Sequence, residues 1–312
     1  MTLPLGASRS SGALNPTSQL PAQLGLKARS YLALTKPRII ELLLVTTLPT
    51  MFVARRGVPS VTLMALTMIG GALAAGGANA LNMVLDRDID RLMKRTQNRP
   101  LVTGELTPAA ATVFALVLEV GAFLELWLTV NMLSAILAVS ATAFYIFVYT
   151  ILLKRTSSQN IVIGGAAGAV PVLVGWTAVT GKLAWAPVVL FAVIFIWTPP
   201  HFWSLAIRYR EDYKAAHVPM LPVVATFKRT ARQIVLYSVL LVAFTALFAA
   251  VGHMGPFYDV SAALLGAGFL LMAVRLQRQT SEKAAMAMFH YSITYLTLLF
   301  AAMAADVVIR HP

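Results

Sequence analysis

Long apolar runs separated by short polar segments make up most of the chain after its first 36 residues. A helix needs about 20 apolar residues to cross a bilayer, and nine runs approach that length. They lie at about 37–54, 61–85, 108–130, 132–153, 161–180, 184–207, 233–252, 260–277 and 285–307. None shows the alternation over about ten residues that is typical of a membrane β-strand. The pattern therefore predicts an all-α protein with nine transmembrane helices.

The first 36 residues contain Ser, Pro and Gly but no sustained apolar stretch. We predict a flexible cytoplasmic tail over residues 1–36 and a single membrane domain over residues 37–312. A cleavable signal peptide needs a short apolar region, and the tail lacks one. We therefore expect the first apolar run to be a retained span.

Composition supports a membrane protein, because 58% of residues are hydrophobic and only 12% are charged. A soluble domain typically carries about 25% charged residues. The chain has no cysteine, which excludes disulfides, thiolate metal sites and thioether attachment of haem.

The net charge of +13 raises the possibility of nucleic-acid binding. The basic residues, however, cluster in particular loops between apolar runs. With nine spans, 21 of the 25 Lys and Arg residues fall on one side of the membrane. The positive-inside rule explains such a bias. We therefore predict no nucleic-acid partner, a location in the cell (plasma) membrane, a cytoplasmic N-terminus and an external C-terminus.

Asn82, Asp86 and Asp90 are spaced four residues apart where the second apolar run ends. On a helix this spacing places the three side chains on one face. Acids at a membrane boundary are costly unless a cation or a water-filled cavity receives them. Oxygen ligands suit Mg²⁺, which usually binds together with a phosphate-bearing substrate. The spacing therefore indicates a Mg²⁺ site at Asp86 and Asp90.

Basic residues follow in the same loop, where Arg95 and Arg99 are again four apart. Guanidinium groups bind phosphate oxygens in a bidentate manner. The combination of acidic and basic side chains in one loop therefore favours a site for Mg²⁺ and a diphosphate. The alternative is a solvated loop with ion pairs between residues four apart. That alternative explains Asp88 and Lys94 well. It explains Asn79 and Asn82 poorly, because both lie inside the apolar run.

A second loop combines prolines, aromatic residues and a histidine. Pro199-Pro200 is expected to kink or break the sixth span just before His201, and a broken span inside a protein usually lines a cavity. His201 lies between Trp197 and Trp203 in sequence, and a histidine can bind haem iron. The alternative is a histidine satisfied by a neighbouring backbone carbonyl. By the span count, the polar residues after His201 lie on the same side as Asp86.

These motifs resemble the UbiA-type superfamily of intramembrane aromatic prenyltransferases. The resemblance rests on Asn82-x-x-x-Asp86-x-x-x-Asp90, the nine-span layout and the second polar loop after the sixth span. It implies a fold of nine helices around a central cavity that opens near the cytoplasmic face.

The finer resemblance is to the branch of this superfamily whose members transfer farnesyl to haem. The segments that carry it are residues 86–101, 198–203, 209–213 and 218–222. Most superfamily members have a second Asp-rich motif where this chain has Tyr209 and Tyr213. His217 is a departure from the branch, in which a glycine is usual at that position.

The resemblance implies transfer of farnesyl from farnesyl diphosphate to the 2-vinyl group of haem B, with addition of water. Catalytic roles are implied for Asn82, Asp86, Asp90, Arg95, Arg99 and Lys214. Substrate-binding roles are implied for Asn79, His201, Arg208, Tyr209, Arg210, Asp212 and Tyr213. The implied cofactor is Mg²⁺, and haem B is a substrate. The implied partners are the lipid bilayer and either a haem A synthase or a haem-copper oxidase.

Two other functions stay open. A prenyltransferase with a quinone precursor or a chlorin as acceptor would share the first loop and differ in the second. A transporter or an assembly protein without chemistry would more often show paired broken helices near the membrane midplane. Only one double-proline segment is present in this chain.

Overall fold

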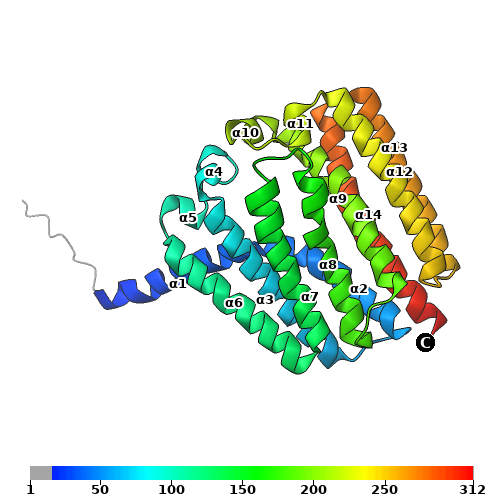
Figure 1. The fold of residues 1–312 in the computed structure, drawn as a ribbon, viewed down its shortest axis with the longest axis horizontal. Helices are drawn as coiled ribbons and strands as arrows, with labels where there is room; N and C mark the ends of the chain where they lie inside the picture. Colours follow the sequence, from blue (N-terminus) through cyan, green and yellow to red (C-terminus); the bar gives the residue numbers. More distant parts are fainter. Residues whose placement is uncertain (1–15, 312) are drawn as a thin grey trace, which may run out of the picture.

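The computed structural model describes residues 16–311, except for the side chains of residues 16–24 and 38–44. Within these residues the chain is helical and contains no β-strand. The long helices run side by side as a bundle (Figure 1). They are α2 (Pro37–Arg55), α3 (Val61–Leu85), α6 (Pro108–Thr129), α7 (Met132–Ala143) continued by the π-helix η1 (Phe144–Leu153), α8 (Asn160–Thr180), α9 (Trp185–Arg208), α12 (Phe227–Val251), α13 (Pro256–Gln279) and α14 (Glu282–Arg310).

The apolar runs of the sequence coincide with these helices. In the part of the chain that the structure describes, eight helices are long and apolar enough to cross a membrane. They are α3, α6, α7 with η1, α8, α9, α12, α13 and α14. Helix α2 lies where the first span was expected. The all-α membrane fold is therefore confirmed, whereas the count of nine spans and the central cavity stay predictions.

Helix α1 (Pro16–Thr35) differs from the expected flexible tail. Leu34 is fully buried, and the ring of Tyr31 lies 4.9 Å from that of Phe114 in α6. The Ser30 hydroxyl donates a hydrogen bond of 2.5 Å to Glu105. The prediction is wrong for α1, because a few well-spaced apolar side chains dock the helix without forming a sustained apolar run. Residues 1–15 lie outside the described residues.

Four short helices connect the long ones at one end of the bundle (Figure 1). They are α4 (Arg87–Leu92), α5 (Pro100–Thr103), α10 (Arg210–Ala215) and α11 (Leu221–Val224). The first two belong to the loop after α3, and the other two belong to the loop after α9. The C-terminus lies at the opposite end of the bundle. Both polar loops of the sequence therefore lie at one end, as predicted.

The main core lies among the helices of the second half of the chain. Phe248, Phe269 and Phe300 are fully buried there. Helix α9 is the most buried of the eight candidate spans, because 67% of its most apolar stretch is buried inside the protein. The second loop of the sequence is therefore anchored by the most central helix.

Helix α9 runs without a break through Pro199 and Pro200. Of the kink or break expected in the sixth span, the break is therefore wrong, and the kink stays a prediction. The Thr198 hydroxyl donates to the Ile194 carbonyl at 2.9 Å, and the Ser204 hydroxyl donates to the Pro200 carbonyl at 2.6 Å. Pro199 and Pro200 leave the carbonyls of Phe195 and Ile196 without their helical N–H donors. Neighbouring helices can compensate for such losses in a membrane helix, and α9 is the most buried of the candidate spans.

Candidate functional site

Asn82, Asp86 and Asp90 lie on one face, as their spacing predicted. Asp86 ends α3, and its backbone N–H donates to the Asn82 carbonyl at 2.9 Å. The Asp90 N–H in turn donates to the Asp86 carbonyl at 2.9 Å, so helical spacing persists into α4. All three residues are at most 3% exposed. The helix therefore brings two carboxylates and an amide together in a buried place.

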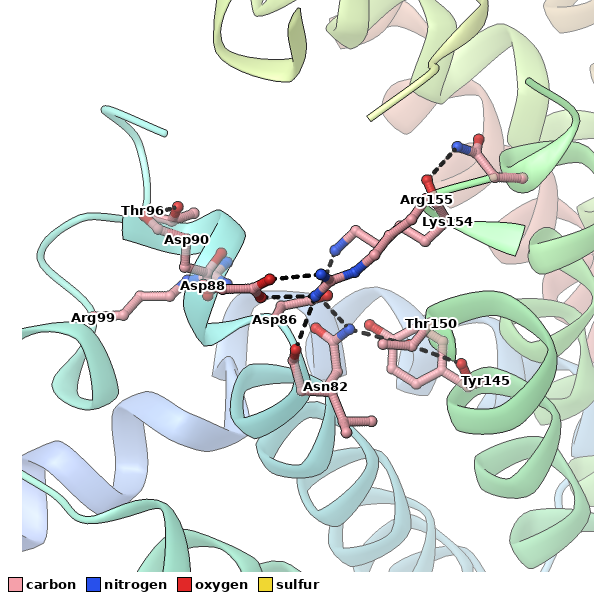
Figure 2. Close-up of polar contacts among 12 residues, drawn as sticks. Asn82, Asp86, Asp88, Asp90, Thr96, Arg99, Tyr145, Thr150, Lys154 and Arg155 are labelled. Carbon is pink, nitrogen blue, oxygen red and sulfur yellow. Dashed lines mark hydrogen bonds and ion pairs between the residues drawn. The ribbon is translucent and has the colours of Figure 1, made fainter. Parts of the chain in front are cut away.

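The carboxylate of Asp86 is held through one of its two oxygens (Figure 2). Asn82 Nδ2 donates to Asp86 Oδ2 at 2.7 Å, and Lys154 Nζ forms an ion pair with the same oxygen. The other oxygen, Oδ1, is buried and has no hydrogen-bond partner. A buried acceptor without a partner costs free energy, and it is suited to receive a cation.

Asp90 is paired with a base of its own loop. Arg99 Nη1 contacts Asp90 Oδ2 at 2.5 Å, and the Thr96 hydroxyl donates to the Asp90 carbonyl at 2.9 Å. Within residues 25–37 and 45–311, no three acidic or histidine side chains form a metal-binding group. Two carboxylates suffice for Mg²⁺, which usually keeps several water ligands and binds substrate phosphates as well. The residues present therefore fit Mg²⁺ with a diphosphate.

Lys154 was missed as a site residue by the sequence reasoning. It follows η1 directly and was counted only among the basic residues of a loop. Its neighbour Arg155 binds the exposed Asp88 through contacts of 2.6 and 2.7 Å, and the hydrogen bond from Arg155 lowers the pKa of Asp88. Asp88 therefore belongs to an ion pair, as the alternative interpretation held, but its partner comes from another span.

Lys36 was also missed. It lies between α1 and α2 in the left-handed region, with a φ of 53°, and its Nζ donates to Asn82 Oδ1 at 2.9 Å. Burial lowers the pKa of Lys36 from 10.5 to about 7, and the charges of Arg99 and Lys154 act in the same direction. No short-range signal predicts these contacts, because the partner residues are far apart in sequence.

Asn79 has a different neighbour from the one its spacing suggested. Its Nδ2 donates to the Thr35 carbonyl at 3.0 Å. This contact ties α3 to the junction between α1 and α2. The structure thus places Asn79 beside Lys36 rather than against the carboxylates.

The second loop meets the first through Arg95. The Arg95 guanidinium lies 5.5 Å from the ring centre of Tyr209. Burial raises the pKa of Tyr213, whereas the charge of Arg95 and a side-chain hydrogen bond with it have the opposite effect. The two loops were predicted to lie on the same side of the membrane, and the structure goes further by bringing them into contact. Of the other residues in the second loop, Arg210 and Lys214 are exposed and Asp212 is half-buried.

Arg208 is exposed and forms an ion pair of 2.6 Å with Glu282 at the start of α14. It is the last residue of α9, at the end from which the second loop continues, as expected from sequence. A carboxylate of the chain already occupies its guanidinium group.

His201 lies inside the bundle, where it is 6% exposed. Its Nδ1 is 2.7 Å from the Ser292 hydroxyl. Its ring stacks on Trp197 at 4.3 Å and lies 4.7 Å from Phe289. The partner is a hydroxyl of α14 and not the backbone carbonyl that the alternative interpretation expected.

The fold and this acid-and-base site define an intramembrane prenyltransferase. The UbiA prenyltransferase family model matches residues 43–293, and the chain therefore belongs to that family. Two solved structures share its fold. A digeranylgeranylglyceryl phosphate synthase aligns with a TM-score of 0.75 and 18% identity, over 91% of this chain and 99% of that one. A UbiA homologue from Archaeoglobus fulgidus bound to GPP and Mg²⁺ aligns with a TM-score of 0.61 and 16% identity, over 88% and 99%.

Within the family, the chain is similar to proteins named protoheme IX farnesyltransferase. The one from Streptomyces coelicolor is 50% identical over 311 residues, which cover 97% of this chain and 98% of that protein. The one from Parafrankia sp. is 55% identical over 282 residues, which cover 89% and 90%.

Proposed function

We propose that this protein transfers farnesyl from farnesyl diphosphate to the 2-vinyl group of haem B, giving haem O and diphosphate. Relatives named protoheme IX farnesyltransferase match nearly the whole chain at about half identity. The observation that carries the chemistry is the buried Asp86, with one oxygen held by Lys154 and the other without a partner. That arrangement favours a site that receives a cation.

The reaction balances as an electrophilic addition. The bond between farnesyl C1 and oxygen breaks, and the electron pair leaves with the diphosphate. The vinyl π electrons form the new carbon–carbon bond to C1. A water oxygen then bonds to the resulting carbocation and loses a proton. Apolar surroundings protect the first cation from early attack by water.

Asp86 and Asp90 are the residues that would hold Mg²⁺. When bound, Mg²⁺ neutralises charge on the leaving diphosphate. Support comes from the unpartnered oxygen of Asp86 and from the family fold, in which a solved neighbour binds GPP and Mg²⁺. Arg99 and Lys154, which contact the two carboxylates, supply positive charge for the diphosphate oxygens. Arg95 and Lys214 add to that charge, and Asn82 orients Asp86.

The second loop binds the acceptor in this proposal. His201 positions the porphyrin beside Tyr209 and Tyr213, and Arg208 or Arg210 pairs with a propionate. Ser292 and Trp197 hold the His201 ring in one orientation. The proposed location is the cell membrane with a cytoplasmic N-terminus. The product passes to haem A synthesis or to a haem-copper oxidase.

Paired assays with purified protein test this function. Diphosphate release from farnesyl diphosphate and Mg²⁺ is measured with haem B, with a quinone precursor and with neither acceptor. We expect release to depend on haem B. Asp86→Ala should abolish release and leave haem binding intact, whereas His201→Ala should weaken haem binding. Dependence on the quinone precursor would instead favour the other acceptor class, and no release with any acceptor would favour a protein without chemistry.

A further inference from the structure

Glu119 lies in the middle of α6, within a candidate membrane span, and the proposed function gives it no role. Its side chain is half-buried. An acid within a span is costly, and it is retained where a partner or a function compensates for the cost. Oε1 of Glu119 accepts a hydrogen bond of 3.1 Å from the Thr142 hydroxyl of α7. Oε2 is buried and has no hydrogen-bond partner among the described residues. The carboxyl group therefore links α6 to α7.

The same carboxyl group fits against α3 at a glycine. A methyl group on Gly77 would come within 2.7 Å of Glu119 Oε1 and 3.0 Å of the Ala115 carbonyl oxygen. A contact of 2.7 Å would force the neighbouring atoms to move, whereas a glycine lets two membrane helices approach closely. Helices α3 and α6 pack side by side (Figure 1). Glu119 is therefore enclosed by α3, α6 and α7.

Helices α3 and α7 both lead from Glu119 to the carboxylate site. In α3, Asn82 follows Gly77 by five residues, which is about 8 Å along the helix axis. Helix α7 continues into the π-helix η1, which Lys154 follows directly. The winding of η1 is wider than that of an α-helix, because the Lys154 N–H donates to the Tyr149 carbonyl at 2.8 Å, five residues back. A displacement of α3 or α7 at Glu119 would therefore reach the site.

At the site, α3 and η1 hold Asp86 from two sides (Figure 2). Asn82 Nδ2, on α3, donates to Asp86 Oδ2 at 2.7 Å and to Thr150 Oγ1, on η1, at 3.2 Å. Lys154 forms the ion pair with the same oxygen of Asp86. The separation of the two helices therefore decides whether Oδ2 keeps both partners and whether Oδ1 stays free for a cation.

We propose that Glu119 is a positioning residue that sets the separation of α3 and η1 and so holds Asp86 in the orientation that receives Mg²⁺. The inference rests on the proposed function. Glu119 acts through Gly77 on α3 and through Thr142 on α7, and not by contact with a substrate. Removal of a residue that orients a metal ligand typically lowers metal affinity or activity about 10-fold to 100-fold. We expect the lower end of that range, because Glu119 acts on Asp86 through two helices.

Glu125 provides a matched control on the same helix. It is also half-buried, it fits against Gly70 of α3, seven residues before Gly77, and its Oε2 is likewise buried without a partner in the described part of the chain. Its Oε1, however, accepts from the Thr129 hydroxyl of its own helix at 3.0 Å. Glu125 therefore shares the fit against a glycine with Glu119, but its hydroxyl partner does not lie on α7.

The first measurement is the Mg²⁺ concentration that gives half-maximal farnesylation of haem B by purified protein with farnesyl diphosphate. Glu119→Ala should raise this concentration about tenfold and lower kcat. Glu119→Gln should recover most of the loss, because it keeps the side-chain length and an oxygen for the Thr142 hydroxyl. Glu125→Ala should leave the concentration unchanged. A merely structural defect would lower the active fraction of the protein without shifting the half-saturating concentration.

A binding measurement without turnover gives a second readout. Mg²⁺ is titrated in the presence of inorganic diphosphate, and the rise in unfolding temperature is followed. The half-saturating Mg²⁺ concentration should again rise about tenfold in Glu119→Ala and stay unchanged in Glu125→Ala.

Thr142→Val tests the link from its other end. This substitution removes the hydroxyl and keeps the shape of the side chain, so it should raise the half-saturating Mg²⁺ concentration about as much as Glu119→Ala. The double variant Glu119→Ala/Thr142→Val should also show about a tenfold effect, whereas independent residues would give about a hundredfold effect. Multiplied effects in the double variant would overturn the link.

A pair of glycine substitutions leaves both linked side chains in place. Gly77→Ala should raise the half-saturating Mg²⁺ concentration by displacing the Glu119 carboxyl group. Gly121→Ala in α6 is the control, since a methyl group there meets nothing within 4 Å. Thermal unfolding identifies any general loss of folding. Thr142→Val and Gly77→Ala keep the inference testable if Glu119→Ala does not fold.

The outcomes distinguish this inference from the function beneath it. If the wild type forms no farnesylated haem and does not respond to Mg²⁺ with diphosphate, the proposed function fails, and the positioning role fails with it. If the wild type is active and folded Glu119→Ala keeps its Mg²⁺ requirement, only the positioning role is overturned. A lower kcat with an unchanged Mg²⁺ requirement would also overturn it, because Glu119 would then act on folding alone.

Discussion

Replacing Lys154 with Met removes the cation that faces a fully buried carboxylate. Asp86 is 0% exposed, and the Lys154 side chain is 14% exposed. Two opposite unit charges in contact are worth about 4 kcal/mol at an effective dielectric constant near 20. Breaking a buried ion pair by removing one partner costs about 3–5 kcal/mol. We expect Lys154→Met to destabilise the protein by about 3 kcal/mol, because Asn82 still donates to Asp86. The measurement is thermal unfolding in detergent without Mg²⁺.

Two controls make this prediction specific. The double variant Asp86→Asn/Lys154→Met removes both charges and should recover most of the lost stability. Arg155→Met breaks the exposed pair with Asp88 and should cost at most about 1 kcal/mol. Added Mg²⁺ should stabilise Lys154→Met more than the wild type, because the carboxylate then lacks a competing cation. A Lys154→Met variant that unfolds at the wild-type temperature would refute the reasoning.

Substitutions at three further positions, Asp306, Lys36 and His217, test other parts of the structure. Asp306 is buried and accepts a hydrogen bond from the Gly255 N–H at 2.7 Å. Asp306→Ala should therefore lower the free energy of unfolding by about 2 kcal/mol in denaturation assays. An unchanged free energy of unfolding would contradict a stabilising role for this hydrogen bond. Burial lowers the pKa of Lys36 from 10.5 to about 7, so the unfolded chain binds this proton more tightly. Stability should therefore rise as pH increases from about 7 to 10.5, and Lys36→Met should remove that rise in pH-dependent melting curves; a rise that persists would sink the idea. His217 has a φ of 53°, in the left-handed region that glycine adopts without strain. His217→Gly should therefore raise stability by about 1 kcal/mol, and His217→Ala should not. Equal melting temperatures for the two variants would argue against backbone strain at His217.

Much of the fold follows from the apolar runs, because the hydrocarbon thickness of a bilayer sets the length of a spanning helix. The structure places a long helix at each predicted run. Helix α1 was missed because it docks through isolated side chains such as Leu34. The break at Pro199 and Pro200 was predicted from backbone chemistry alone. Helix α9 nevertheless continues through both prolines, and it is the most buried candidate span, where neighbouring helices can support it.

The carboxylate face was predictable because it depends on local helical spacing. The α3–α4 junction keeps that spacing through Asp86. The bases that neutralise the face were not all predictable. Lys36 and Lys154 reach Asn82 and Asp86 from other spans, and one sequence carries no signal for such contacts. The π-helical register that turns Thr150 and Lys154 toward the site is likewise a tertiary effect.

The most direct test of the central claim is the mass of haem extracted after incubation of purified protein with haem B, farnesyl diphosphate and Mg²⁺. The account predicts a haem that is heavier by one farnesyl group and one water. The same reaction in ¹⁸O-labelled water should place the label in that product, because water quenches the final carbocation. Recovery of unchanged haem B after incubation with folded protein would contradict the account.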